Sequence, residues 1–356
     1  MKQKKRFSIF PICLKPWTSF EIDDAIDLKN VRPCCWSIRV VGDLDSQSIG
    51  DIWNGEGFRE FRERLKQGDL TGICDSNCPN LTNASFLKRT YLREIFRKPT
   101  LNKLTNFLEI IFRKNTLNSS PLHFKVTPSL ACNLDCIMCY QNNDGSIKLP
   151  DFFYTDLSSY LKSASTIHVQ GGEIFASSAG IKFLKNLDRN QFPNLKIGII
   201  TNGTFPHSES WSILKSLRLD WIIVSVDAAN KETFEFIRRK AAWEEILSNI
   251  EQLVEIRNQT KKSFQIYIDM TVILQNFMEI PEFIELAFHL GVFATFHCFT
   301  SLDIDLRFDV LSSLANSEIL IKKINEGLRL AKKYRMAMAT TTLNQILEIH
   351  RSKMQH

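Results

Sequence analysis

The chain has 356 residues, which is enough for one large domain or two unequal ones with a buried core. Apolar residues make up 44% and charged residues 24%, values ordinary for a soluble globular protein, and no apolar run is long enough to cross a membrane. The net charge of +6, from 45 basic and 39 acidic residues, permits a polyanionic partner but does not by itself indicate one.

The nine cysteines indicate metal ligation in a reducing compartment rather than disulfides. The segment Met1 to Leu14 has basic residues before a short apolar stretch, as a signal peptide does. However, Pro11 interrupts the apolar part, and no small-residue cleavage site follows. We therefore expect a cytoplasmic protein.

Residues 1–85 form the first predicted unit, and they contain five of the cysteines. A β-type run is present at Trp36–Val41, ahead of Gly42. A helical pattern follows from Ile52 to Lys66, and Gly68 is expected to end it. Cys74 and Cys78, spaced C-x3-C, close the unit.

Residues 86–120 form a basic connection that Pro99 splits into two predicted helical segments. This segment contains eight lysine and arginine residues but only two acidic residues, Glu94 and Glu109. Interleaved leucine, isoleucine and phenylalanine side chains predict amphipathic helices packed on one of the domains. A solvated helix face is the simpler interpretation of the charge, and binding of nucleic acid or an acidic substrate is the alternative.

From residue 121 onward, β-type runs alternate with helical patterns. The predicted strands are His123–Leu130, Thr166–Gln170, Leu195–Ile200, Trp221–Val226, Phe264–Ile273 and Ala294–Phe299, and a helix is expected at Ser317–Tyr334 after the last. This alternation predicts an α/β fold in which parallel strands and crossover helices form a partial (β/α)6 barrel over residues 121–356. Reactive loops in such folds lie at the carboxyl ends of the strands.

Three cysteines follow the first of these strands. Cys132, Cys136 and Cys139 are spaced C-x3-C-x2-C. A cubane iron-sulfur cluster usually takes four thiolates, so three leave one iron open to another ligand. A zinc loop or a set of structural cysteines is the alternative, but zinc favours paired C-x2-C units, and the next cysteine, Cys298, is far away.

The cysteine loop and its flanking strands resemble the radical S-adenosylmethionine (radical SAM) superfamily. The resemblance implies that SAM chelates the open iron of a [4Fe-4S] cluster, beside an aromatic residue at Tyr140. It also implies SAM contacts at the ends of the next strands and in the helix after the fourth, namely at Gly171, Gly172, Glu173, Asn202, Ser225, Asp227 and Arg238. Strand alternation independently puts Ser225 and Asp227 on one face, and glycines let the main chain approach a ligand closely. Each pattern alone has a plainer interpretation: a strand-end turn, an Asn-Gly turn, or a surface arginine.

The first unit is similar to the SPASM auxiliary-cluster module, which that family normally places after its core. The resemblance implies a second, fully ligated [4Fe-4S] cluster on Cys13, Cys34, Cys74 and Cys78. Cys34 and Cys35 cannot both point inward easily, and we favour Cys34. A structural zinc site with four thiolates is the alternative.

The remaining candidate ligands are isolated. His123, His168, His289 and His297 have no second ligand at metal spacing, which favours packed or surface roles. Cys298 is interpreted as a buried free thiol, with an active-site thiol as the alternative.

The resemblance implies a two-cluster enzyme. It would cleave SAM reductively to methionine and a 5′-deoxyadenosyl radical, which abstracts hydrogen from a peptide or small-molecule substrate. The expected electron donor is a reduced flavodoxin or ferredoxin, and we expect neither a membrane nor a nucleic-acid partner. An RNA methylase of the same superfamily, or a non-catalytic iron-sulfur or zinc protein, is the alternative; the methylase would need a second cysteine near SAM.

Overall fold

The structure is a computed structural model, which describes residues 10–22, 28–75, 78, 81, 84–139, 141, 144–259, 264–299 and 307–354. The chain divides into two compact units. The first unit comprises residues 1–127, 148–168 and 189–196, and the second comprises residues 128–147, 169–188 and 197–356. The division reflects how densely the residues of each unit contact one another, and the domain boundaries expected from the sequence stay a prediction.

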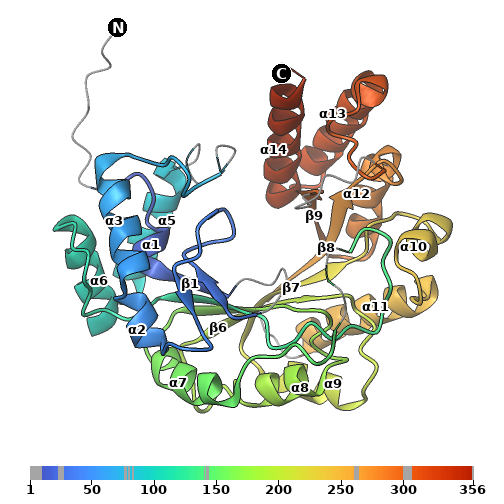
Figure 1. Cartoon of the computed structure of the whole chain (residues 1–356). Coiled ribbons are helices and arrows are strands. Elements are labelled where there is room, and N and C mark those ends of the chain that lie inside the picture. Colours follow the sequence, from blue (N-terminus) through green and yellow to red (C-terminus); the bar gives the residue numbers. More distant parts are fainter. Residues whose placement is uncertain are drawn as a thin grey trace, which may run out of the picture. The chain divides into compact units, whose positions relative to one another are not determined.

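The first unit combines short strands with helices (Figure 1). β1 (Ser19–Ile22) pairs in parallel with β4 (His123–Val126) and antiparallel with β2 (Asn30–Arg32), which in turn pairs antiparallel with β3 (Gly42–Asp43). The described helices of this unit are α1 (Lys15–Thr18), α2 (Ile49–Trp53), α3 (Glu56–Gln67), α5 (Ala84–Arg97), α6 (Leu101–Ile111) and α7 (Asp151–Leu161).

Two expectations for the first unit are wrong in detail. The run at 36–41 is not a strand: it makes a single bridge, from Ser37 to Cys74, and of its apolar side chains Ile38 is 58% exposed whereas Val41 is buried. The helix expected at 52–66 is two helices, α2 and α3. They separate at Asn54, whose side chain exchanges two 2.8 Å hydrogen bonds with the main chain of Leu117.

Other expected signals are confirmed. Gly68 ends α3 in the left-handed conformation with φ 76°, as a helix C-terminus often requires. Pro99 lies between α5 and α6. The non-helical segment after α6 is held by buried side chains: the indole of Trp17 donates to the Lys114 carbonyl at 2.8 Å, and that of Trp53 to the Ser119 carbonyl at 2.7 Å.

The second unit holds the expected parallel sheet. β6 (Lys196–Thr201), whose first residue belongs to the first unit, β7 (Leu219–Ser225), β8 (Gln265–Val272) and β9 (Phe293–Cys298) pair in parallel in that order. The helices in and after their connections are α8 (Ser178–Lys185), α9 (Glu209–Ser216), α10 (Lys231–Ile237), α11 (Trp243–Gln259), α12 (Ile280–His289), α13 (Ser317–Lys333) and α14 (Ala337–Lys353).

β5 (Thr166–Val169) completes the six strands predicted after residue 121, so the expected α/β class with an open, partial barrel is confirmed. Strand ends differ by a few residues; β4 stops at Val126 rather than Leu130. Among the described residues, no helix is long and apolar enough to cross a membrane.

Candidate functional site

The three-cysteine loop lies in the second unit and is fixed to the end of α10. The amide of Asp135 donates to the Arg239 carbonyl at 3.2 Å, and that of Ile137 to the Ile237 carbonyl at 3.0 Å. Inside the loop, the Cys139 amide donates to the Cys136 carbonyl at 3.1 Å. The backbone therefore holds three thiols on one short loop, as a shared cluster needs.

Polar groups surround two of these thiols. The Cys132 sulfur lies 3.4 Å from the Leu134 amide and 3.9 Å from Asn202 Nδ2, and the Cys136 sulfur lies 3.9 Å from Arg238 Nη1. Burial raises the pKa of all three thiols, that of Cys136 to about 11. Iron would have to displace these protons, and the neighbouring N–H donors and the guanidinium would then stabilise the thiolates.

Gly172 and Glu173 contact the cysteine loop directly. The Gly172 amide donates to the Ser129 carbonyl at 3.1 Å, and the Glu173 amide to the Ala131 carbonyl at 2.7 Å. A Cβ on Gly172 would stand 2.2 Å from the Ala131 carbonyl oxygen. Glycine is thus required here by close packing of two chain segments.

The Glu173 carboxylate is buried and used by the protein itself. It accepts hydrogen bonds from the Thr201 hydroxyl at 2.7 Å, the Asn202 amide at 2.6 Å and the Phe175 amide at 3.0 Å. Burial raises its pKa, and these donors oppose the rise. Glu173 therefore ties the ends of β5 and β6 to the cysteine loop, a role that its sequence pattern did not reveal.

Asp227 and Arg238 form a buried ion pair next to the cysteine loop. Arg238 donates from Nε to Asp227 Oδ2 at 2.8 Å, while the other carboxylate oxygen accepts from the Thr271 amide at 2.7 Å. Asp227 has φ 63°, which breaks the alternation expected from Ser225. The expectation that both residues share one extended strand face is therefore wrong, because β7 ends at Ser225.

The structure describes three of the four remaining residues that were predicted to contact SAM. The Asn202 amide group donates to Asn133 Oδ1 at 3.0 Å as well as facing Cys132, so it lies beside the loop, while its contact with SAM stays a prediction. Ser225 lies at the carboxyl end of β7, in register with Asp269 of β8. Gly171 directly precedes the two residues described above, and Tyr140 lies outside the described residues.

A histidine that the sequence interpretation set aside belongs to this region. His297 Nδ1 lies 2.6 Å from Asp269 Oδ1, and the histidine side chain is 57% exposed. The nearby Asp269 raises the pKa of His297 to about 9. Since the pair joins two strands, only the parallel register of β8 and β9 could have revealed it.

The first unit gathers the other predicted ligands. The Cys13 thiol interacts electrostatically with the thiols of Cys34, Cys74 and Cys78. Burial raises the pKa of Cys13, Cys34 and Cys74, that of Cys74 to about 11. Cys34 is buried and Cys35 is exposed, which favours Cys34 as the ligand. The bridge between Ser37 and Cys74 joins the two halves of this set. Among the described residues, no three His, Cys, Asp or Glu side chains lie close enough together to hold one metal ion.

Family models match both parts of the chain. The model of the radical SAM superfamily matches residues 126–287, and that of SPASM, an iron-sulfur cluster-binding domain, matches residues 13–79. The chain is a radical SAM protein with an N-terminal SPASM-like domain. These domains imply SAM and [4Fe-4S] clusters as its cofactors. The three thiols of the core loop and the four of the first unit match in number a cluster with one open iron and a fully ligated cluster.

Curated relatives are similar over part of their length. The chain is 26% identical over 177 residues to the antilisterial bacteriocin subtilosin biosynthesis protein AlbA of Bacillus subtilis, covering 48% of this chain and 38% of that one. It is 27% identical over 174 residues to the AdoMet-dependent heme synthase of Methanosarcina barkeri, covering 47% of each. The chain thus spans less than half the length of these two relatives.

Among solved structures, Streptococcus suis SuiB bound to precursor peptide SuiA is 15% identical, with a TM-score of 0.47 over 78% of this chain and 60% of that one.

Proposed function

We propose that this radical SAM protein is an enzyme that modifies a peptide. When bound, the core cluster supplies the electron that cleaves SAM to methionine and a 5′-deoxyadenosyl radical able to abstract a substrate hydrogen. The observation that carries the proposal is the three-thiol loop, fixed to α10 and flanked by Asn202 and Arg238, within the region that matches the superfamily.

In this proposal the loop thiols of Cys132, Cys136 and Cys139 hold the core cluster. SAM lies at the carboxyl ends of the strands, where the main chain at Gly171 to Glu173, the side chains of Asn202 and Ser225, and the aromatic ring of Tyr140 contact it. Arg238 keeps Asp227 as its partner, and its Nη1 faces the cluster side of the loop. A SAM carboxylate near this guanidinium would gain a charged donor.

The N-terminal module serves a different electron step. Its four thiols, on Cys13, Cys34, Cys74 and Cys78, would complete a cluster without an open iron, which suits electron transfer rather than SAM binding. We propose the domain boundaries expected from the sequence: 1–85 for this module, 86–120 for the connection and 121–356 for the core.

The similarity to the bacteriocin biosynthesis protein AlbA favours a peptide substrate over a small-molecule substrate. The RNA methylase alternative is disfavoured by the position of Cys298. This residue is in register with Val272 of β8 and so faces the side opposite Asp269 and His297. Its thiol instead interacts with Lys353 and Asp309.

Anaerobic co-expression tests the proposal. The protein is produced with each short reading frame that flanks its gene, and the peptides are analysed by mass spectrometry. We expect one peptide to change mass with the wild type and to stay unchanged with the Cys136→Ala variant. If no peptide changes while the purified protein cleaves SAM, the substrate is not one of these peptides and the peptide assignment fails.

A further inference from the structure

The α5–α6 hairpin of the first unit carries an exposed apolar surface. Leu101, Leu104, Leu108 and Phe112 follow one another at helical spacing and are 83%, 40%, 52% and 70% exposed. Phe96, at the end of α5, is 61% exposed and packs edge-on against Phe107 of α6. Contiguous exposed apolar side chains of this size usually mark an interaction site.

Cations flank this surface on α5. Arg89, Arg93 and Arg97 are exposed and lie on one stripe at spacings of four residues. Among the described residues, no acidic side chain pairs with any of the three. We call this combined surface, with its arginine stripe and the five exposed apolar side chains, the hairpin face.

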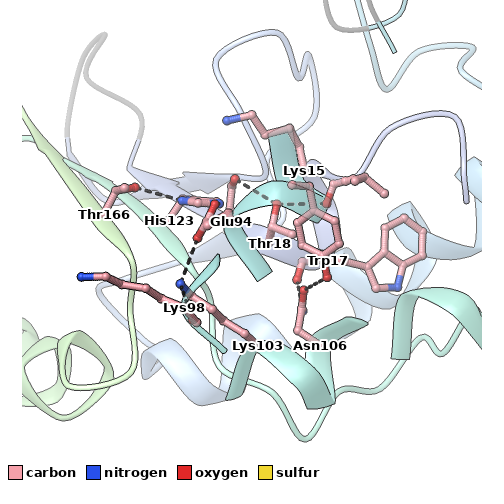
Figure 2. Close-up of polar contacts among 12 residues, drawn as sticks. Lys15, Trp17, Thr18, Glu94, Lys98, Lys103, Asn106, His123 and Thr166 are labelled. Atoms are coloured by element: carbon pink, nitrogen blue, oxygen red, sulfur yellow. Dashed lines mark hydrogen bonds and ion pairs between the residues drawn. The ribbon is translucent and has the colours of Figure 1, made fainter. Parts of the chain in front are cut away.

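The acids of the hairpin point inward. Glu94 lies 3.7 Å from Lys103 Nζ and 3.5 Å from His123 Nε2, as Figure 2 shows. Glu109 is buried and accepts from the Ser119 hydroxyl at 2.6 Å. The hairpin face is therefore apolar and cationic, which fits an acidic partner.

The same hairpin reaches the segment that carries Cys13 of the N-terminal module. Lys88 of α5 interacts electrostatically with the Cys13 thiol, and Tyr91 packs edge-on against Phe10, three residues before Cys13. Asn106 of α6 accepts from the Tyr91 hydroxyl at 2.9 Å and donates to the Trp17 carbonyl at 2.6 Å, the latter contact also seen in Figure 2. The helix that carries the arginine stripe therefore packs with its buried side against the segment that leads to a predicted cluster ligand.

We infer that the hairpin face is the docking site of an acidic one-electron carrier protein that exchanges electrons with the cluster of the N-terminal module. The inference rests on the proposed function, because it assumes that this module carries a redox cluster. An electron carrier must approach the cluster closely, whereas a membrane surface or a peptide leader has no reason to dock next to Cys13. Small, charged interfaces are usual for such transient redox encounters.

The test uses the holoenzyme with both clusters oxidised, and a photoreduced acidic bacterial flavodoxin as the probe. One electron leaves the flavin and one enters the protein's cluster, so flavin oxidation and cluster bleaching are followed together by stopped-flow absorbance. The charge-reversal variant is Arg89→Glu/Arg93→Glu/Arg97→Glu. Its matched control is Lys322→Glu/Arg329→Glu/Lys332→Glu, which changes three exposed cations of α13 and gives the same net charge.

We expect the hairpin variant to slow the second-order electron transfer about tenfold or more at low salt, with a flattened salt dependence, while the control changes it far less. A second variant, Leu104→Gln/Leu108→Gln, keeps all charges and should also slow the transfer. Equal slowing by the hairpin and control variants, or no slowing by either hairpin variant, would overturn the inference. The hairpin variants could instead abolish binding to anionic lipid vesicles, or self-association, without slowing electron transfer. That result would assign the hairpin face to a membrane or to a second copy of the chain, and it would also overturn the inference.

Dithionite separates this inference from the proposed function. As a small reductant it needs no docking surface, so all variants should form 5′-deoxyadenosine with it at the wild-type rate. If the wild type forms none, the proposed function fails whatever the flavodoxin result. If only a hairpin variant loses the dithionite reaction, the substitution acts on the core and the docking inference is rejected.

Discussion

Gly172 and Glu173 show how residues around the core site are held by the polypeptide itself. The sequence interpretation expected both residues to contact SAM, with the glycine letting the main chain approach the ligand closely. In the structure, the space beside Gly172 is filled by the carbonyls of Leu130 and Ala131, and Glu173 accepts three hydrogen bonds from protein groups. Both residues therefore fix the cysteine loop.

The Gly172→Ala variant should lose the core cluster. Its new Cβ would lie 2.2 Å from a main-chain oxygen, so the loop that carries Cys132 must move. We expect the iron content of the reconstituted protein to fall to that of the N-terminal cluster alone. Gly145→Ala is the control, because a Cβ there would meet Ala131 Cβ at an ordinary 3.5 Å. Wild-type iron content in Gly172→Ala would contradict this packing role.

His297 should give the protein a stability that depends on pH. Its pKa is raised by Asp269 from the ordinary 6.5 to about 9, so the ion pair stabilises the fold fully below pH 6.5 and is lost as pH rises through 9. Denaturant unfolding should show wild type more stable than His297→Gln at low pH and the difference shrinking toward pH 9. His289→Gln, at an exposed position on α12, is the control for the loss of a histidine side chain. A difference that grows with pH would reverse the assignment.

At the scale of single residues, the sequence could predict candidate ligands whose spacing along the chain is typical of a cluster site. The two cysteine sets are marked in this way, and their role as cluster ligands stays a prediction. The exposure of Cys35 favours Cys34 within the first set. The pairs Asp227–Arg238 and Asp269–His297 could not be predicted, since their members are brought together by chain reversal or strand register.

The elements were predicted where hydrophobic periodicity is strong, as for the parallel strands β6 to β9 and for the two helices separated by Pro99. The helix α14 was missed. Its first turns are rich in threonine, a poor helix former, and the structure satisfies those hydroxyls internally: Thr341, for example, donates to the Ala337 carbonyl at 2.9 Å.

Asn106 is a fully buried polar residue of α6, and its loss should destabilise the fold. Its side chain accepts from Tyr91 and donates to the Trp17 carbonyl and to Ser119 Oγ at 3.0 Å, all in the interior. Asn106→Ala leaves these groups unpaired, which we expect to cost about 2 kcal/mol in the free energy of unfolding measured with denaturant. Asn118→Ala, with an exposed side chain, should change it little. Equal effects of the two substitutions would show that the buried network contributes nothing.

The whole molecule should carry two clusters in separate units of the chain. Anaerobic reconstitution of the wild type should give twice the iron and sulfide of either cysteine variant: Cys132→Ala/Cys136→Ala/Cys139→Ala, or Cys13→Ala/Cys34→Ala/Cys74→Ala/Cys78→Ala. Metal analysis checks this directly. If the core variant contains zinc and no iron, the N-terminal module is a zinc site instead.

The central claim, that the core loop cleaves SAM reductively, is tested most directly by measuring 5′-deoxyadenosine from reconstituted protein, SAM and dithionite. We predict that 5′-deoxyadenosine forms slowly without substrate and that Cys136→Ala abolishes its formation. Cys298→Ala should retain it, because the Cys298 side chain lies on the face of β9 opposite His297. Two results would contradict the account. One is no 5′-deoxyadenosine from protein that holds the core cluster and binds SAM; the other is S-adenosylhomocysteine as the main product.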